Sequence, residues 1–182
     1  MTLFAGVFRS SIERPSRFTS GGDAWAVTAR LTGLPQYEED GRHLVHLGAR
    51  ALGGAALVMT EMVCVSPHAR ITLGCTGMYT GEHLAHWRRV VAFVHEWSDA
   101  KICLQLGHSG RKGSTLLPWE GADVPIPHGW PVIGPSPIAY NDAIGAPREM
   151  TRGDMDAVRD DFVRSAAMGA EAGFDMLELH AA

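Results

Sequence analysis

Three short sequence runs that are apolar on both faces constrain the fold of this chain more than any other feature. The runs are 56–65, 101–106 and 174–180, and each follows a stretch whose apolar residues repeat with helical spacing. The predicted helices are 42–53, 82–97 and 151–172. Strands that are apolar on both faces are typical of parallel sheets covered by helices. Helix and strand therefore alternate along the chain, and this order predicts an α/β fold with right-handed crossovers.

The segments outside these runs are less regular. The whole chain of 182 residues is 46% hydrophobic, which is enough for one core, and we expect one domain over 42–182. Residues 1–41 carry several arginines, few acids and no sustained period, so we expect an atypical, weakly structured segment. A transit peptide is the alternative interpretation of such a start. Residues 113–150 hold most of the prolines and predict a long ordered excursion of the kind that usually serves binding.

Charge and cysteine content narrow the class of partner. Sixteen Lys and Arg residues against 20 Asp and Glu give a net charge of −4, which argues against nucleic acid or an anionic membrane as the main partner. We therefore expect the main partner to be a small molecule. Cys64, Cys75 and Cys103 are unclustered in sequence and predict neither a disulfide framework nor a thiolate metal site. No apolar run reaches the roughly 18 residues that span a bilayer, so we expect a soluble, cytoplasmic protein.

Polar residues stand at the carboxyl ends of the three predicted strands, which is the catalytic face of a (β/α) barrel. They are Thr60 and Glu61, Gln105 and His108, and Glu178 and His180. The amide of Gln105 suits the edge of a heterocycle, although a core glutamine bonded to backbone is equally compatible. His180 could donate to a carbonyl oxygen or act as an acid, and a satisfied core histidine is the alternative. We expect Gln105 and His180 to project into one concavity.

Other motifs argue against competing chemistries. His43/His46 and His83/His86 have the i,i+3 spacing of some metal sites but lack the glutamate of H-E-x-x-H, so we expect no metal. A metal-dependent barrel hydrolase that uses these histidines is the weakest of the functional hypotheses. The motifs of a Rossmann dinucleotide site, a P-loop and an α/β-hydrolase are absent from the sequence.

The chain resembles the flavin-dependent Old Yellow Enzyme family over residues 42–182. The motifs that carry the resemblance are HLVHLGARALGGAALVMTEMVCVSPHARI, EHLAHWRRVVAFVHEWSDAKICLQLGHSGRKGS and AGFDMLELHAA. The run QLGHSGRKGST followed by LPWEG is especially similar to the reductase-type barrel domain of salicylyl-CoA hydroxylase and anthraniloyl-CoA monooxygenase/reductase proteins. The resemblance implies a (β/α)₈ barrel that binds FMN, is reduced by NADH or NADPH, and passes hydride to an activated alkene or an aromatic-CoA-derived substrate.

The resemblance also assigns roles to individual residues. Gln105 would hydrogen-bond the pyrimidine edge of the flavin, and Met62, with Glu61 before it, would lie beside the ring. Arg111 and His108 would belong to the rim that meets the substrate. His180 would be the first histidine of the H-x-x-[HN] pair that grips the substrate carbonyl oxygen.

The sequence departs from the family pattern in two places. The opening strand expected before Asp40-Gly41 is not recognisable, and the second residue of the histidine pair would be position 183. A (β/α)₈ barrel takes about 250 residues, and its phosphate site follows strands seven and eight. We therefore expect an apparently truncated, N-terminal part of a TIM barrel, either a homo-oligomer or a piece of a larger fusion protein. A non-catalytic α/β module without bound cofactor is the alternative function.

Overall fold

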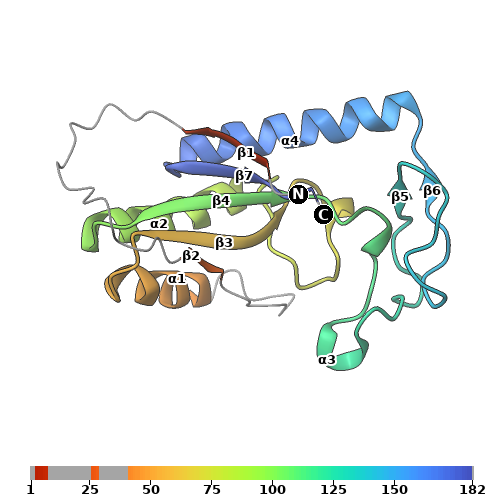
Figure 1. Cartoon of the computed structure of the whole chain (residues 1–182), viewed down its shortest axis with the longest axis horizontal. Helices are drawn as coiled ribbons and strands as arrows, with labels where there is room; N and C mark the ends of the chain where they lie inside the picture. The colour runs from red at the N-terminus through yellow and green to blue at the C-terminus, as the bar shows by residue number, and fades with distance from the viewer. Residues whose placement is uncertain (1–2, 8–25, 29–40, 182) are drawn as a thin grey trace.

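A five-stranded sheet with three helices packed against it forms the centre of the molecule (Figure 1). The computed structural model describes residues 3–7, 26–28 and 41–181. The strands are β1 (Leu3–Val7), β2 (Ala26–Thr28), β3 (Leu57–Cys64), β4 (Lys101–Gly107) and β7 (Met176–Leu179), in the order β1-β7-β4-β3-β2. The covering helices are α1 (Arg42–Leu52), α2 (Gly81–Trp97) and α4 (Arg152–Ala172). The predicted α/β fold is confirmed.

The helix boundaries follow from local capping chemistry. The Thr80 side chain accepts from the backbone N–H of His83, and His83 Nδ1 accepts in return from the Thr80 N–H, which closes the first turn of α2. Thr151 and Asp154 start α4 in the same way. Gly173 ends α4 at φ 95°, a left-handed conformation that glycine adopts without steric cost.

The core lies between the sheet and the helices. Ile102, Leu104 and Leu106 of β4 are fully buried on the face that meets the helices. A Cβ at Gly169 of α4 would lie 2.5 Å from the Cδ2 atom of Leu104, so helix and strand approach closely at this glycine. Because side chains alternate along a strand, Cys103, Gln105 and Gly107 face the other way, toward the side that is the interior of a closed barrel.

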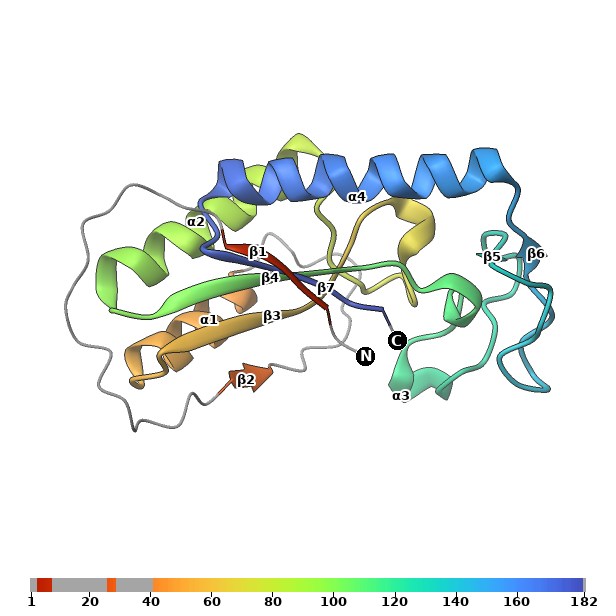
Figure 2. The same cartoon turned by 45° about the horizontal axis from the view of Figure 1, so that its top comes forward.

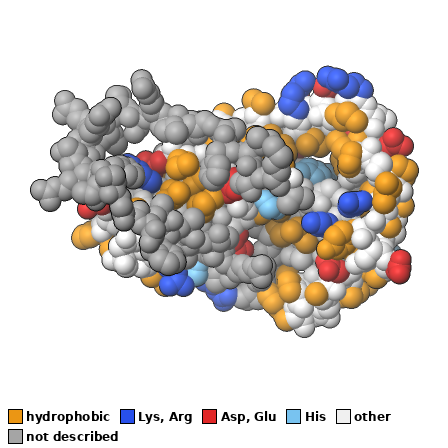
Figure 3. All heavy atoms as spheres, viewed as in Figure 1, with side chains coloured by type: hydrophobic (Ala, Val, Ile, Leu, Met, Phe, Trp, Pro, Cys, Tyr) orange, Lys and Arg blue, Asp and Glu red, His pale blue; other side chains and the backbone are white. Residues whose placement is uncertain are grey.

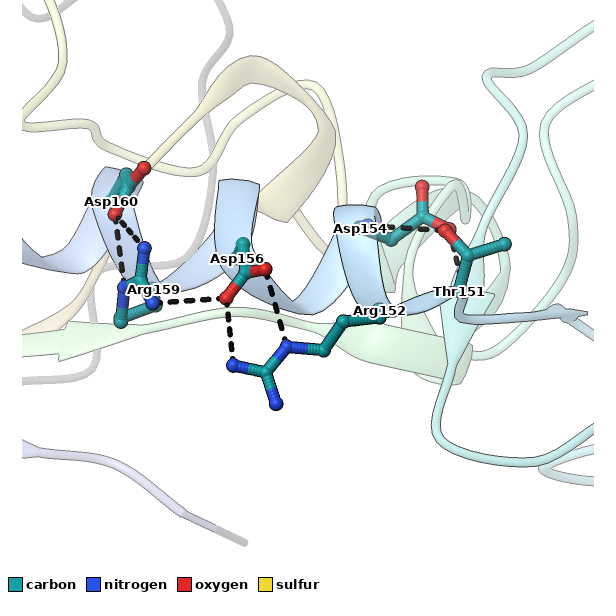
Figure 4. A network of polar contacts seen from close by, with 6 residues as sticks. All are labelled: Thr151, Arg152, Asp154, Asp156, Arg159 and Asp160. Atoms are coloured by element: carbon teal, nitrogen blue, oxygen red, sulfur yellow. Dashed lines mark hydrogen bonds and ion pairs between the residues drawn. The ribbon is translucent and has the colours of Figure 1, made fainter.

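The outer surface of α4 carries a ladder of charges (Figure 4). Arg152 pairs with Asp156 at 3.1 Å, and Arg159 pairs with Asp156 at 2.9 Å and with Asp160 at 2.7 Å. These side chains are largely exposed, so solvent screens the pairs and each one stabilises the helix only slightly. The ladder supports the helix and keeps this face solvated.

Two strands fall within the segment that we expected to be weakly structured. β2 pairs in parallel with β3, with Val27 opposite Val58, and β1 pairs antiparallel with β7, with Leu3 opposite Leu179. These two strands are short elements within a segment whose sequence shows no sustained period. The signal is weak in sequence because each strand is short and is stabilised by hydrogen bonds to an otherwise open sheet edge. Apart from Gly41, the rest of this segment lies outside the described residues.

The long excursion between β4 and α4 is ordered, as predicted. It contains the 3₁₀ turn η3 (Gly110–Lys112), the short helix α3 (Pro118–Gly121), and a two-stranded sheet of β5 (Ile133–Gly134) and β6 (Arg148–Glu149). Figures 1 and 2 place it beyond the carboxyl ends of β3 and β4. The excursion therefore borders the end of the sheet where the sequence predicts the site.

Candidate active site

Three neighbouring strands bring the predicted site residues into register. Met62 of β3 is the Cα partner of Gln105 in β4, and Gln105 is the Cα partner of Glu178 in β7. The backbone N–H of His180 donates to the Leu106 carbonyl at 2.8 Å, so pairing continues to the last predicted site residue. Glu178 and His180 share a face by alternation. Gln105 and His180 thus lie at the same end and on the same face of the sheet.

An extra residue in β3 makes this register possible. Met59 pairs with Cys103 and Met62 pairs with Gln105, so β3 uses one more residue than β4 over this stretch. Thr60 lies in the bulge, and its Oγ1 accepts the Gln105 backbone N–H at 2.9 Å. The bulge turns Met62 to the face of Gln105, which is a common use of bulges near active sites. Glu61, the other bulge residue, is partly buried.

The Gln105 side chain is oriented by a buried carboxylate. Its Nε2 donates to Glu178 Oε2 at 2.9 Å, and Glu178 is only 5% exposed. A carboxylate is an acceptor, so it binds the amide nitrogen and directs the amide oxygen away from itself. The oxygen and the second N–H of Gln105 are left to bind a ligand. The Gln105 amide is therefore bonded to a side chain, and not to backbone as the alternative interpretation expected.

Gly107 provides the space in which Met62 lies. A Cβ at Gly107 would stand 2.4 Å from Met62 Cγ, 2.6 Å from Met62 Sδ and 3.6 Å from His180 Cβ. The thioether of Met62 therefore passes directly over the glycine, with His180 alongside. The His180 side chain is exposed. Met62, Gln105 and His180 form one group at the strand ends, which we call the strand-end cluster.

His108 and Arg111 lie in the turn that follows β4. His108 Nδ1 accepts from the Gly110 N–H at 3.0 Å, and burial lowers the pKa of the imidazole, with Asp161 opposing and His68 assisting. Asp161 belongs to α4, and His68 belongs to the 3₁₀ turn η2 (Pro67–Ala69). Arg111 is exposed, and its Nη1 donates to the Ile138 carbonyl at 3.4 Å, which ties the excursion to the strand end.

The excursion presents an apolar surface with cations among it (Figure 3). Its exposed large apolar side chains are Trp119, Val124, Ile138 and Tyr140. The Lys112 ammonium lies 5.3 Å from the Tyr140 ring centre, and the Arg70 guanidinium lies 5.0 Å from that of Trp130. The excursion's exposed aromatic side chains offer apolar contact area to a ligand.

Two other groups of reactive side chains do not contribute to the strand-end cluster. Burial, and then the charge of Glu178, raises the pKa of Cys103 to about 12, which makes this thiol a poor nucleophile. The four histidines of the H-x-x-H pairs are helical, as predicted, and the rings of His43 and His86 meet edge to face at 6.2 Å. Within residues 3–7, 26–28 and 41–181, no group of three or more His, Cys, Asp or Glu side chains could hold a metal ion.

Sequence reasoning missed two features of the strand-end cluster. Thr60 was recognised only as a polar residue at a strand end, and Glu178 only as a polar strand-end neighbour of His180, because neither the bulge nor the cross-strand bond to Gln105 is visible in sequence spacing. Gly107 was noted only within the motif QLGHSGRKGST. A glycine inside a strand pattern signals the close approach of another group, and that signal could have located the Met62 contact.

Comparison with known proteins identifies the family of the chain. The profile of the NADH:flavin oxidoreductase / NADH oxidase family matches residues 26–182. An NADH:flavin oxidoreductase of Gibberella zeae is 35% identical over 146 residues, covering 77% of this chain and 35% of the relative. An NADPH dehydrogenase of Bacillus subtilis is 33% identical over 150 residues, covering 80% of this chain and 40% of the relative.

Solved structures agree as well. Morphinone reductase in complex with tetrahydroNAD superposes with a TM-score of 0.63 at 29% identity, covering 77% of this chain and 40% of the reductase. The fold and the strand ends thus define part of a flavin oxidoreductase barrel. The chain belongs to the NADH:flavin oxidoreductase / NADH oxidase family, which is the Old Yellow Enzyme family of the sequence resemblance.

The match covers only part of the length of each relative. The chain spans 35–40% of the length of these relatives. The family match begins at Ala26, the first residue of β2, so this short strand belongs to the part shared with the family. No helix among the described residues is long and apolar enough to cross a membrane.

Proposed function

We propose that this chain forms part of the catalytic barrel of an FMN-dependent NAD(P)H oxidoreductase of the ene-reductase type. The observation that carries the proposal is the strand-end cluster, in which Gln105 and Met62 adjoin His180 on one face of the sheet. Family membership supports the choice of a flavin, because the family's proteins are NADH:flavin oxidoreductases.

The residues present fit the ring of a flavin. The flavin pyrimidine ring offers alternating hydrogen-bond donors and acceptors along its edge, and the Gln105 amide, oriented by Glu178, presents one acceptor and one donor. Met62 lies over Gly107 and offers a flat, polarizable surface for an aromatic ring. Glu61, beside Met62 in the bulge, would belong to the same wall. Bound FMN would supply hydride from its reduced ring to an activated alkene.

The residues of this chain would position the substrate and stabilise charge. The His180 imidazole, exposed at the end of β7, would donate a hydrogen bond to the carbonyl oxygen of the substrate. That bond strengthens as negative charge builds on the oxygen, so it favours the transition state over the ground state. Arg111 would hold the excursion against the strand end, and His108 would form the neighbouring rim.

The finer assignments also belong to this proposal. NADH or NADPH would be the reductant, and the substrate would be an enone or an aromatic acyl-CoA derivative, as in the salicylyl-CoA hydroxylase and anthraniloyl-CoA monooxygenase/reductase proteins. The exposed Trp119 and Tyr140 support an aromatic substrate. A cytoplasmic homo-oligomer, or one part of a larger fusion protein, is the proposed setting.

The test uses a full barrel that contains this chain. We expect FMN to copurify and 2-cyclohexenone to be consumed with equivalent oxidation of NADH or NADPH. His180→Ala should lower kcat/KM for the enone while FMN stays bound, and Gln105→Leu should weaken FMN binding. If the barrel binds no flavin, the proposal is wrong and the non-catalytic α/β module becomes the better account.

A further inference from the structure

Two cysteines that are separated in sequence meet beyond the end of β3. After η2 the chain returns to β3, and Cys64 pairs with Gly77 in a parallel bridge. The Cys64 N–H donates to the Thr76 carbonyl at 2.8 Å, and the Met78 N–H donates to the Cys64 carbonyl at 2.9 Å. These backbone bonds bring Cys75, the neighbour of Thr76 in the chain, close to Cys64, and the Cys64 side chain is the largest influence on the pKa of Cys75. The spacing of the cysteines in sequence does not indicate this proximity, because the return of the chain to β3 is invisible in sequence.

The Cys75 sulfur lies among hydrogen-bond donors. The Thr72 N–H donates to Cys75 Sγ at 3.4 Å, and Thr72 Oγ1 lies 3.8 Å from the same atom. Donors of this kind stabilise a thiolate. The Cys64 thiol, followed by backbone and hydroxyl donors of the Ile71–Thr72 segment, lowers the pKa of Cys75 to about 6, although burial opposes the shift. Cys75 is therefore largely a thiolate at neutral pH.

The two cysteines differ in their exposure to solvent. Cys64 is fully buried, whereas Cys75 is partly exposed. A small oxidant can therefore reach Cys75 first, and the buried Cys64 lies against the backbone of the neighbouring Thr76. Sensor cysteines share these properties: thiolate character, access, and an adjacent resolving cysteine.

We propose that Cys75 is a peroxide-reactive site and that Cys64 resolves the oxidised product into an intramolecular disulfide. The Cys75 thiolate attacks hydrogen peroxide, so that an S–O bond forms, the O–O bond breaks and hydroxide leaves. The Cys64 sulfur then attacks the sulfenic acid, an S–S bond forms and water leaves. In total the two thiols lose two electrons and two protons, and one peroxide becomes two waters.

The disulfide would fix a segment that borders the strand ends. The Cys75 N–H donates to the Thr72 carbonyl at 3.3 Å, and Thr72 pairs with Thr115 of the excursion. A covalent link from Cys64 to Cys75 would therefore join the end of β3 to the turn that supports the excursion. This link does not depend on flavin binding.

Peptide mapping after peroxide treatment tests the proposal on the whole chain. Trypsin separates the three cysteines, since Cys64 falls in 51–70, Cys75 in 71–88 and Cys103 in 102–111. We expect the peptides 51–70 and 71–88 to become linked in the unreduced digest, with the intact chain losing two hydrogen atoms. Peptide 102–111 should stay reduced. Absence of the linked pair, or oxidation of Cys103 before Cys75, would overturn the proposal.

Cysteine variants distinguish the residue that attacks peroxide from the residue that then forms the disulfide. Cys64→Ala should leave a sulfenic acid at Cys75 that dimedone traps, and Cys75→Ser should leave Cys64 reduced. Cys103→Ser is the matched control and should form the link at the wild-type rate. Oxidation of Cys64 at the wild-type rate in Cys75→Ser would show that Cys75 is not the site of attack.

The pH dependence of alkylation gives a second readout. A pKa of about 6 instead of 9.0 raises the thiolate fraction at pH 7 from ~1% to ~90%, but a Brønsted slope of ~0.45 lowers intrinsic nucleophilicity roughly 20-fold. The net gain in rate is then only about fourfold, so the inflection is the better measure. We expect the iodoacetamide rate at Cys75 to inflect near pH 6, and to inflect at higher pH in Cys64→Ala. An inflection above pH 8 in the wild type would refute the assigned environment.

Discussion

Gly107→Ala tests the geometry of the strand-end cluster most directly. The new Cβ would stand 2.4 Å from Met62 Cγ and 2.6 Å from Met62 Sδ, and real Cβ atoms do not approach other atoms so closely. Cγ is near the backbone of Met62, so rotation about the outer torsions of the side chain cannot relieve this contact. Met62 must leave its position over residue 107.

Two opposing effects set the magnitude. Alanine in place of glycine inside a strand stabilises by about 0.5–1 kcal/mol through the conformational entropy of the chain. Overpacking of a filled site costs about 1–3 kcal/mol. We therefore expect Gly107→Ala to lower the free energy of unfolding by about 1–2 kcal/mol, since steric overlap exceeds the entropic gain.

Urea unfolding of four chains measures this effect: wild type, Gly107→Ala, Met62→Ala and the double variant. Removing the Met62 side chain removes the overlap, so the double variant should be about 1–2 kcal/mol more stable than the sum of the single changes implies. Gly145→Ala is the matched control, because a Cβ there meets no atom within 4 Å. Additive single changes, or equal losses at Gly107 and Gly145, would refute the placement of Met62.

Three further predictions follow from other contacts. Gln105→Leu leaves the buried Glu178 carboxylate without its donor and should cost about 1–3 kcal/mol in urea unfolding, a loss that Gln105→Leu with Glu178→Leu should largely recover. The pKa of Asp175 is lowered because the Ile102 N–H, His95 and Lys101 outweigh burial, so its stabilisation is present above the ordinary value of 3.8 and is lost as pH falls below it. Asp175→Asn should flatten the pH dependence of unfolding in that acid window, and an unchanged slope would contradict the assignment. The 182-residue chain alone should not retain stoichiometric FMN, because the proposed cluster binds only the ring; a monomeric size-exclusion peak with equimolar flavin would show otherwise.

The periodicity of apolar residues predicted the main helices and strands, but it did not predict the contacts between neighbouring strands. The runs around Val58, Leu104 and Leu177 are apolar on both faces, and that pattern is local. The bulge at Thr60 depends on how β3 pairs with β4, which no local pattern records. β2 was missed for the same reason, since three residues carry no period and the strand is stabilised by its pairing with β3.

The candidate site residues differ in the same way: some could be predicted from local sequence, and others depend on contacts between distant segments. Gln105 and His180 were identified because a polar residue at the end of an apolar strand is unusual, and the resemblance gave each a role. Cys75 was overlooked because its reactivity comes from Thr72 and Cys64, and the chain reversal that brings Cys64 to it cannot be deduced from spacing.

The antiparallel pairing of β1 with β7 has a consequence for barrel assembly. In a parallel barrel, the free edge of β7 is the edge that accepts the next strand. Here residues 3–7 already engage that edge, with Phe4 opposite Glu178. Any incoming parallel strand therefore competes with β1 for the same backbone groups, and barrel closure becomes a strand exchange. The rate of closure would then depend on how often β1 dissociates from β7, and weakening β1 would accelerate assembly while leaving β7 more open to pairing with other chains.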